Sequence, residues 1–333
     1  MKKSLACLAL LALTTAGIQA HAANSINLSN YNVSGTYALD ILNGSAGGIS
    51  GLEASAVTYA QDRNSLFFVG DEGTGVVEIS LTGQTLGFMN FNWAGTGSSN
   101  NDAEGLTYLG NGVLVVAEER LQNAYQFSYS NGGTVNLANS LYASFGPTIG
   151  NVGIEGISYD ARNGNFVTAK QDNPAQLSIY NSVSFSNAAA ADAVPSIQFS
   201  GASSVLGLNS LSDVQTLSSV NSLANTAGAD NILVLSLDSR KLIEIDRQGN
   251  QKSSLDLANI FPRNNFEGLT IDQNGTIYLV AEQDQMTGAL AGAKSQLIVL
   301  TAPVPEPETY AMLLAGLGLI GFAARRQKKF CCA

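Results

Sequence analysis

Residues 104–120 read EGLTYLGNGVLVVAEER, and this stretch decides the fold. One apolar segment precedes Asn111-Gly112 and a second one follows it. Asn-Gly is the strongest short signal for a β-hairpin, because both central positions of its turn need a positive φ. The stretch therefore predicts two antiparallel strands whose far ends carry acids, Glu104 on the first strand and Glu118 and Glu119 on the second.

The same pattern recurs along the chain. Close copies begin at Glu155 (EGISYDARNGNFVTAKQD) and Glu267 (EGLTIDQNGTIYLVAEQD), and weaker ones begin at Ser55 and Ser212. The five copies start at residues 55, 104, 155, 212 and 267, so the steps are 49, 51, 57 and 55 residues. Such a period is typical of propeller blades. We therefore predict an all-β, five-bladed β-propeller with four-stranded antiparallel blades; a six-bladed propeller, a β-sandwich and a solenoid are the alternatives.

The last copy is too short for a complete blade. After TIYLVAEQD, only SQLIVLTA remains before the tail. A propeller closes its ring when one terminus completes the blade begun by the other, which removes an open sheet edge. We expect residues 35–42, GTYALDIL, to supply the missing outer strand.

The two ends of the chain are targeting segments that flank a body at residues 23–302. Residues 1–22 combine two lysines, an apolar run and Ala20-His21-Ala22, the pattern of a secretory signal peptide with an A-x-A cleavage site. Residues 303–330 hold Pro305-Glu306-Pro307, a 15-residue apolar run and a basic cluster. That run predicts a short transmembrane helix, with the basic cluster on the cytoplasmic side.

The C-terminal segment resembles the PEP-CTERM sorting signal of Gram-negative bacteria. The resemblance implies recognition by an exosortase, cleavage near Pro-Glu-Pro, and delivery to the cell surface or the extracellular matrix. For the secretory signal peptide we expect the Sec export machinery as the partner. Until cleavage, the short helix would anchor the chain transiently in the inner membrane.

The body is acidic and lacks the side chains of several catalytic mechanisms. His21 and Cys7 lie in the signal peptide, and Cys331 and Cys332 lie in the tail. The body therefore cannot form a Ser-His-Asp or Cys-His catalytic site, a zinc site with histidine ligands or a disulfide. It keeps 24 of the 26 acidic and 10 of the 16 basic residues, so its net charge is −14. This charge disfavours nucleic acid and suits hard cations.

The recurring acids predict a metal site. In a propeller the first strand of each blade lines the central channel, so the starts of these strands meet at one mouth. Carboxylates crowded there must protonate or share a cation, and Ca²⁺ tolerates such a geometry better than Mg²⁺. The candidate ligands, one from each blade, are Glu53, Glu104, Glu155, Asp213 and Glu267. The alternative is structural: the Glu caps backbone N–H groups, and the Gly that follows it relieves crowding.

A second acidic set ends the second strands, which the hairpins return to the same mouth. It comprises Asp71, Glu72, Glu118, Glu119, Asp238 and Glu282. Lys170 takes the place of an acid in the third copy. Together with Arg120 and Arg240, it could hold a small anionic ligand or balance the acids through salt bridges.

The ordered series of motifs resembles the SdiA-regulated domain family, which is related to the NHL-repeat propellers. The matching segments include 53–59, 104–108, 155–157, 211–214 and 267–269, and the resemblance covers residues 45–301. It implies a five-bladed propeller with a calcium site. Three functions follow as hypotheses. One is a surface-delivered, calcium-binding interaction module for an exopolysaccharide or a small anion. Another is a calcium-dependent hydrolase of phytase, esterase or lactonase type. The third is a purely structural matrix protein that binds neither metal nor ligand.

Overall fold

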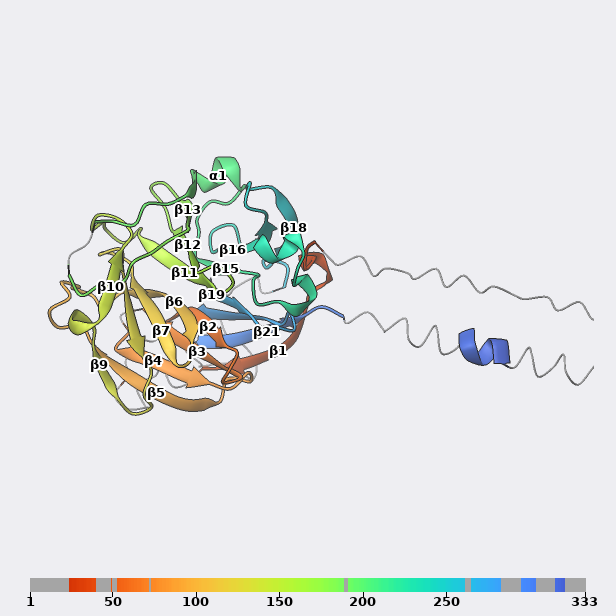
Figure 1. Cartoon of the computed structure of the whole chain (residues 1–333), viewed down its shortest axis with the longest axis horizontal. Helices are drawn as coiled ribbons and strands as arrows, with labels where there is room; N and C mark the ends of the chain where they lie inside the picture. Colours follow the sequence, from red (N-terminus) through yellow and green to blue (C-terminus); the bar gives the residue numbers. More distant parts are fainter. Residues whose placement is uncertain are drawn as a thin grey trace, which may run out of the picture.

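The computed structural model describes residues 24–39, 49, 53–71, 73–188, 191–260, 265–282, 295–303 and 315–320. The strands form five sheets arranged around a central axis, with β2, β6, β11, β15 and β19 nearest the centre (Figure 1). The prediction of a five-bladed propeller is thus confirmed, and the alternative of six blades is wrong.

The blades follow one another in chain order. Blade 1 contains β2 (Ala54–Ala60), β3 (Ser65–Gly70), β4 (Gly75–Ile79) and β5 (Thr85–Asn92). Blade 2 contains β6 (Ala103–Gly110), β7 (Val113–Glu118), β8 (Asn123–Ser128) and β10 (Leu141–Ser144). Blade 3 contains β11 (Ile154–Asp160), β12 (Asn165–Lys170), β13 (Gln176–Tyr180) and β14 (Ile197–Ser200). Blade 4 contains β15 (Asp213–Thr216), β16 (Ile232–Ser236), β17 (Lys241–Ile245) and β18 (Gln251–Asp256).

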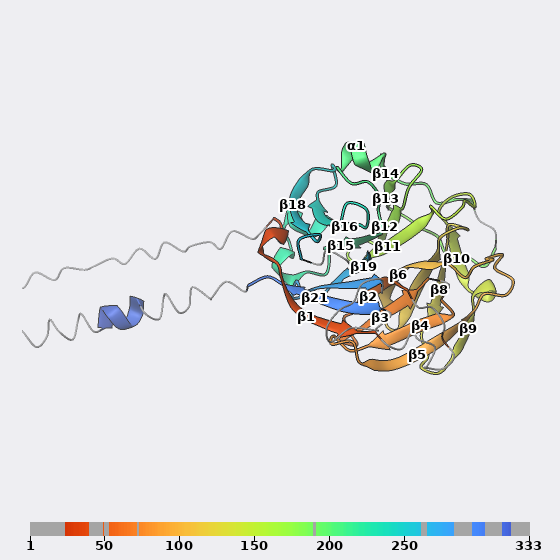
Figure 2. The same ribbon diagram turned by 180° about the vertical axis from the view of Figure 1, so that it is seen from behind.

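Blade 5 joins the two ends of the body. Its strands are β19 (Asn265–Ile271), β20 (Ile277–Glu282), β21 (Ser295–Thr301) and β1 (Asn32–Ala38). β1 pairs antiparallel with β21, from Asn32 opposite Thr301 to Ala38 opposite Gln296. The predicted closure is confirmed, but the strand begins and ends earlier than the expected 35–42, and residues 40–42 lie outside the described part. Figure 2 shows β1 and β21 side by side at one edge of the disc.

One short strand departs from the blade plan. After β8, the chain crosses to the neighbouring blade, where β9 (Thr134–Asn136) pairs parallel with β5. It then returns through a 3-10 turn at Leu137–Asn139 to form β10 of its own blade. This crossing covers the outer edge of blade 1 with a segment of blade 2.

The hydrophobic core is divided among the five interfaces between neighbouring blades. The cluster between blades 1 and 2 includes Phe67, Phe91 and Leu114, and the other four interfaces each have a comparable cluster. The inner strands are buried on both faces in this way: β2, β3 and β4 of blade 1 are buried at every position. The outer strands β5, β14 and β18 keep exposed positions.

The channel has two chemically different mouths. The acidic mouth is the end at which the inner strands begin, at Ala54, Ala103, Ile154, Asp213 and Asn265. The hydroxyl mouth is the opposite end, where the same strands finish at Ala60, Gly110, Asp160, Thr216 and Ile271. The hairpins between first and second strands lie at the hydroxyl mouth, so each second strand ends at the acidic mouth.

Candidate functional site: the acidic mouth

The three Glu-Gly steps form the same local structure. Glu104, Glu155 and Glu267 are each the extra residue in a β-bulge between the first and second strands of their blades. A bulge leaves one residue outside the pairing ladder and redirects its side chain. Ser55 occupies the bulge of blade 1. The repeat therefore places a bulged residue, usually a glutamate, at the start of four inner strands.

The glycine of each Glu-Gly step allows the inner strand of the neighbouring blade to approach closely. A Cβ added at Gly156 would lie 2.5 Å from Oδ1 and 2.7 Å from Cα of Asp213 in blade 4. At Gly268, an added Cβ would lie 2.8 Å from Cα of Ala56 in blade 1. The glycine is thus required by close backbone approach between inner strands, as the structural alternative for the Glu-Gly step assumed.

Three carboxylates converge at the start of β6. One oxygen from each of Asp71, Asp102 and Glu104 can be chosen so that all three lie within 4.8 Å of one another. Asp71 follows β3 of blade 1, whereas Asp102 and Glu104 flank the first residue of β6. Asp102 and Glu104 are 2% and 9% exposed. The cluster therefore joins two blades and is largely shielded from water.

Glu119 and Glu155 extend the cluster toward blade 3. Oε1 of Glu119 accepts the backbone N–H of Gly153 at 3.0 Å. Both glutamates are buried. Burial, with the nearby charge of Asp102, raises the pKa of Glu119 to about 7. The neighbouring carboxyls of Asp102 and Glu155 both contribute to this shift of the pKa. With this pKa, the protonated and deprotonated forms of Glu119 are both populated at neutral pH.

The buried glutamates of the bulges are also shifted toward their neutral forms. Burial raises the pKa of Glu104 well above its ordinary value, and the charges of Asp71, Glu267 and Asp102 raise it further. Burial does the same for the pKa of Glu155, followed by the charges of Glu104 and Glu119. The carboxyls of blades 1, 2, 3 and 5 are therefore close enough at the acidic mouth for their charges to repel one another.

Asp213 and Glu53 occupy different positions from the three bulged glutamates. Asp213 aligns with the glycines, and its Oδ1 and Oδ2 accept backbone N–H groups of Val214 (2.7 Å) and Leu269 (2.6 Å). Burial raises its pKa, and these two hydrogen bonds oppose the rise. Glu53 lies two residues before the bulge, as Asp102 does, and it is exposed; its carbonyl oxygen accepts the N–H of Asp71 at 2.8 Å.

Asp102 was missing from the sequence prediction. The signal was present, since Asp102 stands two residues before Glu104 and corresponds to Glu53 in the first copy. The prediction instead paired Glu53 with Glu104, although the residue that corresponds to Glu104 in the bulge of blade 1 is Ser55.

The second acidic set divides between the cluster and other roles. Asp71 and Glu119 lie in the cluster. Glu118 instead accepts the Ser98 hydroxyl at 2.5 Å and the Leu121 N–H at 2.6 Å, so it holds two loops in place. Asp238 is exposed in the turn after β16. Glu72 lies outside the described residues, and for Glu282, which ends β20, only the backbone is described.

The three predicted cations are engaged with protein groups. Arg120 donates to Asp102 and to the side-chain amide oxygen of Asn151. Lys170 donates to the carbonyl oxygens of Asp172 and Pro174, and burial lowers its pKa. The guanidinium of Arg240 lies over the ring of Phe266, 5.8 Å from its centroid. In blade 3, the residue equivalent to Asp71 and Glu119 is Gln171, whereas Lys170 is equivalent to Glu118.

A family model described as SdiA-regulated matches residues 30–285. The chain belongs to the SdiA-regulated family. The match spans most of the propeller, including all five Glu-Gly or equivalent steps.

Several solved structures are similar to this SdiA-regulated chain at low identity. Glutaminyl cyclase from Myxococcus xanthus is 13% identical, with coverage of 81% of this chain and 95% of that one and a TM-score of 0.48. A luciferin-regenerating enzyme is 10% identical, with coverage of 81% and 95% and a TM-score of 0.46. The β-propeller domain of Cps50 (Swd1) from Myceliophteria thermophila is 13% identical, with coverage of 80% and 73% and a TM-score of 0.35.

The tail of this SdiA-regulated chain matches the PEP-CTERM protein-sorting motif at residues 303–327. This motif is recognised by an exosortase and marks its carrier for export and sorting to the cell surface. Residues 315–320 form a short helix. Within the described ranges, no helix has both the length and the apolar character required to cross a membrane. The expected signal peptide at 1–22 lies outside those ranges.

Proposed function

We propose that this exported SdiA-regulated propeller binds Ca²⁺ at the acidic mouth and acts as a calcium-stabilised interaction module. The ligands would be Glu104, Asp102 and Asp71, with Glu155 and Glu119 beside them. The observation that carries the proposal is the spacing of the carboxylate oxygens of Asp71, Asp102 and Glu104, which all lie within 4.8 Å of one another. Two oxygens bound to one Ca²⁺ at about 2.4 Å can be at most about 4.8 Å apart, so this spacing fits a common ion.

The burial of the cluster supports the same proposal. Removing several carboxylates from water costs free energy unless they are protonated or paired with a cation. Arg120 contacts Asp102, whereas the pKa of Glu104, Glu155 and Glu119 is raised. A divalent ion would lower these pKa values by stabilising the charged forms. Hard oxygen donors without histidine or cysteine favour Ca²⁺ over a transition metal.

A calcium ion here would also join blades. Asp71 belongs to blade 1, Asp102, Glu104 and Glu119 to blade 2, and Glu155 to blade 3. Binding would hold three blades together at one mouth and stabilise the folded protein by mass action. The bound ion would supply electrostatic stabilisation. The carboxylates that would hold it are oriented by the bulges and by the hydrogen bond from the Gly153 N–H to Glu119.

Calorimetric titration of the full chain with CaCl₂ tests the proposal. We expect one stoichiometric site, and Glu104→Gln should weaken Ca²⁺ binding at least tenfold, or about 1.4 kcal/mol. Asp192→Asn, at an exposed acid that accepts a hydrogen bond from Ser144 on the outer strand β10, should leave the affinity unchanged. No heat of binding, together with the same melting temperature in CaCl₂ and in EDTA, would remove the proposal.

The same preparation separates an interaction module from a hydrolase. Aryl phosphates, aryl esters and lactones are offered with and without Ca²⁺. The interaction module predicts no turnover. Calcium-dependent turnover that Glu155→Gln abolishes would assign the site to a hydrolase instead.

A further inference from the structure

A cavity lies at the end of the channel opposite the acids. It has a volume of about 540 Å³ and is lined by residues from all five blades. This volume lies within the range of about 300–1,000 Å³ that is usual for small-molecule sites. It opens at the hydroxyl mouth, where the inner strands end.

The floor of this cavity is a belt of uncharged polar side chains. At the position two residues after the glycine of each step, the blades carry Thr58, Thr107, Ser158, Gln215 and Thr270. Four of these five line the cavity; Ser158 does not. Thr58 Oγ1 accepts the N–H of Tyr108 at 3.1 Å, and Thr107 Oγ1 accepts the N–H of Tyr159 at 3.0 Å. A hydroxyl has one donor and two acceptor sites, so Thr58 and Thr107 keep their O–H groups available to a ligand. Thr270 Oγ1 instead donates to Oε1 of Gln215 at 3.1 Å.

The walls of the cavity differ from one side to the other. The next position along the inner strands is Tyr59, Tyr108 and Tyr159 in blades 1 to 3, whereas blades 4 and 5 have Thr216 and Ile271. Tyr108 and Tyr159 are partly exposed. The ring of Tyr108 is fixed by stacking on Phe67, with centroids 5.9 Å apart, and its hydroxyl accepts the N–H of Gly112 at 2.7 Å. One side is thus aromatic and the other carries hydroxyl groups.

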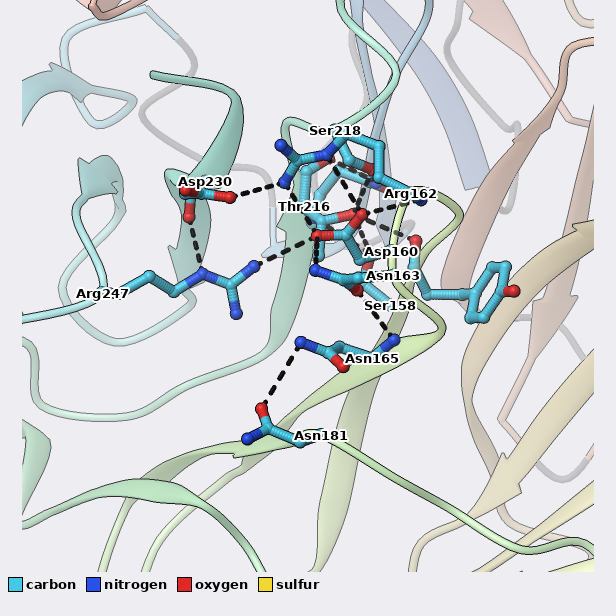
Figure 3. Close-up of polar contacts among 12 residues, drawn as sticks. Ser158, Asp160, Arg162, Asn163, Asn165, Asn181, Thr216, Ser218, Asp230 and Arg247 are labelled. Carbon is cyan, nitrogen blue, oxygen red and sulfur yellow. Dashed lines mark hydrogen bonds and ion pairs between the residues drawn. The ribbon is translucent and has the colours of Figure 1, made fainter. Parts of the chain in front are cut away.

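The hydroxyl-bearing side is held rigidly by the network in Figure 3. Thr216 Oγ1 donates to the carbonyl of Tyr159 at 3.1 Å and lies 3.4 Å from Ser218 Oγ. Next to it, fully buried Asp160 accepts from Arg162 at 3.0 Å and from Arg247 at 3.4 Å. Arg162 also bonds Asp230, on the 3-10 helix Ala227–Asp230, at 2.7 Å. The nearby arginines are therefore committed to carboxylates and leave the cavity lining without a basic residue.

We propose that this cavity binds a neutral saccharide. The lining offers hydroxyl and amide groups to the hydroxyls of a sugar, and partly exposed tyrosine rings to its apolar C–H face. Its one ionisable carboxyl, Asp62, and the strongly acidic body oppose an anionic ligand. The site is separate from the proposed calcium site and lies at the other end of the channel.

The test uses the full chain in a sugar-free buffer. Saturation-transfer NMR and calorimetry are carried out with cellotriose, maltotriose and chitotriose as neutral probes, trigalacturonate as the anionic match and spermidine as the cationic one. We expect at least one neutral trisaccharide to bind with a Kd of about 1 mM or tighter, and trigalacturonate and spermidine to bind at least tenfold more weakly. The same Kd in CaCl₂ and in EDTA separates this site from the calcium proposal.

Two matched variants locate the site. Ser219→Trp introduces a large side chain at a partly exposed lining position and should weaken binding of the neutral probe at least tenfold. Ser99→Trp makes the same change at an exposed serine of the acidic mouth and should leave the Kd unchanged. Melting temperatures verify that both variants fold; if Ser219→Trp does not, Thr107→Val, which removes only the hydroxyl, takes its place. Failure of all three neutral probes to bind, equal or tighter binding of a charged probe, or undiminished binding by the folded lining variant would each overturn the proposal.

Discussion

Gly156 lies where the inner strands of blades 3 and 4 approach most closely. A methyl group there would overlap the carboxyl and the Cα of Asp213, and because the inner strands are held by neighbouring blades, neither can move freely. We expect Gly156→Ala to lower the free energy of unfolding by about 2 kcal/mol or more, since inserting a group into a packed interface forces strain.

Chemical denaturation of this variant measures the cost. Gly150→Ala is the matched control, because an added Cβ at Gly150 meets no atom within 4 Å and its φ is not positive. Equal stability of the two variants would show that the close approach at Gly156 relaxes without cost.

At the scale of single residues, the sequence predicted the acids better than their roles. Glu104 and Glu155 were identified from the repeated Glu-Gly step, and Glu119 from the end of the hairpin. Glu118, one residue earlier, caps loops instead, because the pairing register alternates the directions of adjacent side chains. Asp213 could not be distinguished from the bulged glutamates, since the position of a bulge depends on tertiary pairing rather than on residue type.

At the scale of elements, the pairing of β1 with β21 closes the ring. Asn32 and Thr301 are directly opposed in this pairing, and neither is buried. We expect Asn32→Cys combined with Thr301→Cys to form a disulfide, in a background with Cys331 and Cys332 replaced by serine. A crosslink that closes so long a loop stabilises by about 4 kcal/mol when it is unstrained.

Non-reducing mass analysis and melting with and without reductant provide the measurement. Each single cysteine variant serves as a control and should melt at one temperature in both conditions. A double variant that remains reduced in air, or whose oxidation leaves the melting temperature unchanged, would contradict the closure geometry.

The sequence predicted the closing strand because the last copy was visibly incomplete. It did not predict β9, since Thr134–Asn136 pairs with a strand of another blade and carries no local signal of that partner. The position of this three-residue strand depends on the sheet edge that it covers, and that edge exists only when the blade has assembled.

At the scale of the whole molecule, the stability of the protein should depend on pH through the buried glutamates of the acidic mouth. Glu104, Glu155 and Glu119 have a raised pKa in the folded protein, so between their unfolded and folded pKa values the folded state binds more protons. Their stabilising contribution is therefore complete below about pH 4.5. That of Glu119 is lost as the pH rises through about 7, and those of Glu104 and Glu155 are lost as the pH rises through their own raised pKa values. In EDTA, we expect the melting temperature to fall by roughly 5 °C between pH 5 and pH 8.

Calcium should reverse this dependence, because it binds the deprotonated carboxyls and its stabilising effect grows with pH. Scanning calorimetry at several pH values, with EDTA or with saturating CaCl₂, measures both slopes. Glu119→Gln should flatten the EDTA curve near pH 7. Parallel curves with and without calcium would contradict the proposed ligation.

The number of blades followed from the repeat, and the gathering of acids followed from the hairpins that return each second strand to its starting mouth. The cavity at the hydroxyl mouth was not foreseen. Its floor is made from threonines such as Thr58 and Thr107, which are ordinary strand residues in any single copy. They become a belt only when five inner strands stand around one axis.

The pairing of β21 has a mechanical consequence. Beyond Thr301, the chain leads directly into the sorting motif at 303–327. β21 has β20 on one side and β1 on the other, with backbone hydrogen bonds to both. Tension applied through the tail would act parallel to β21, so the bonds of both ladders would bear the load together in shear rather than open one at a time. A protein held to the cell surface by this end would resist being pulled apart from it.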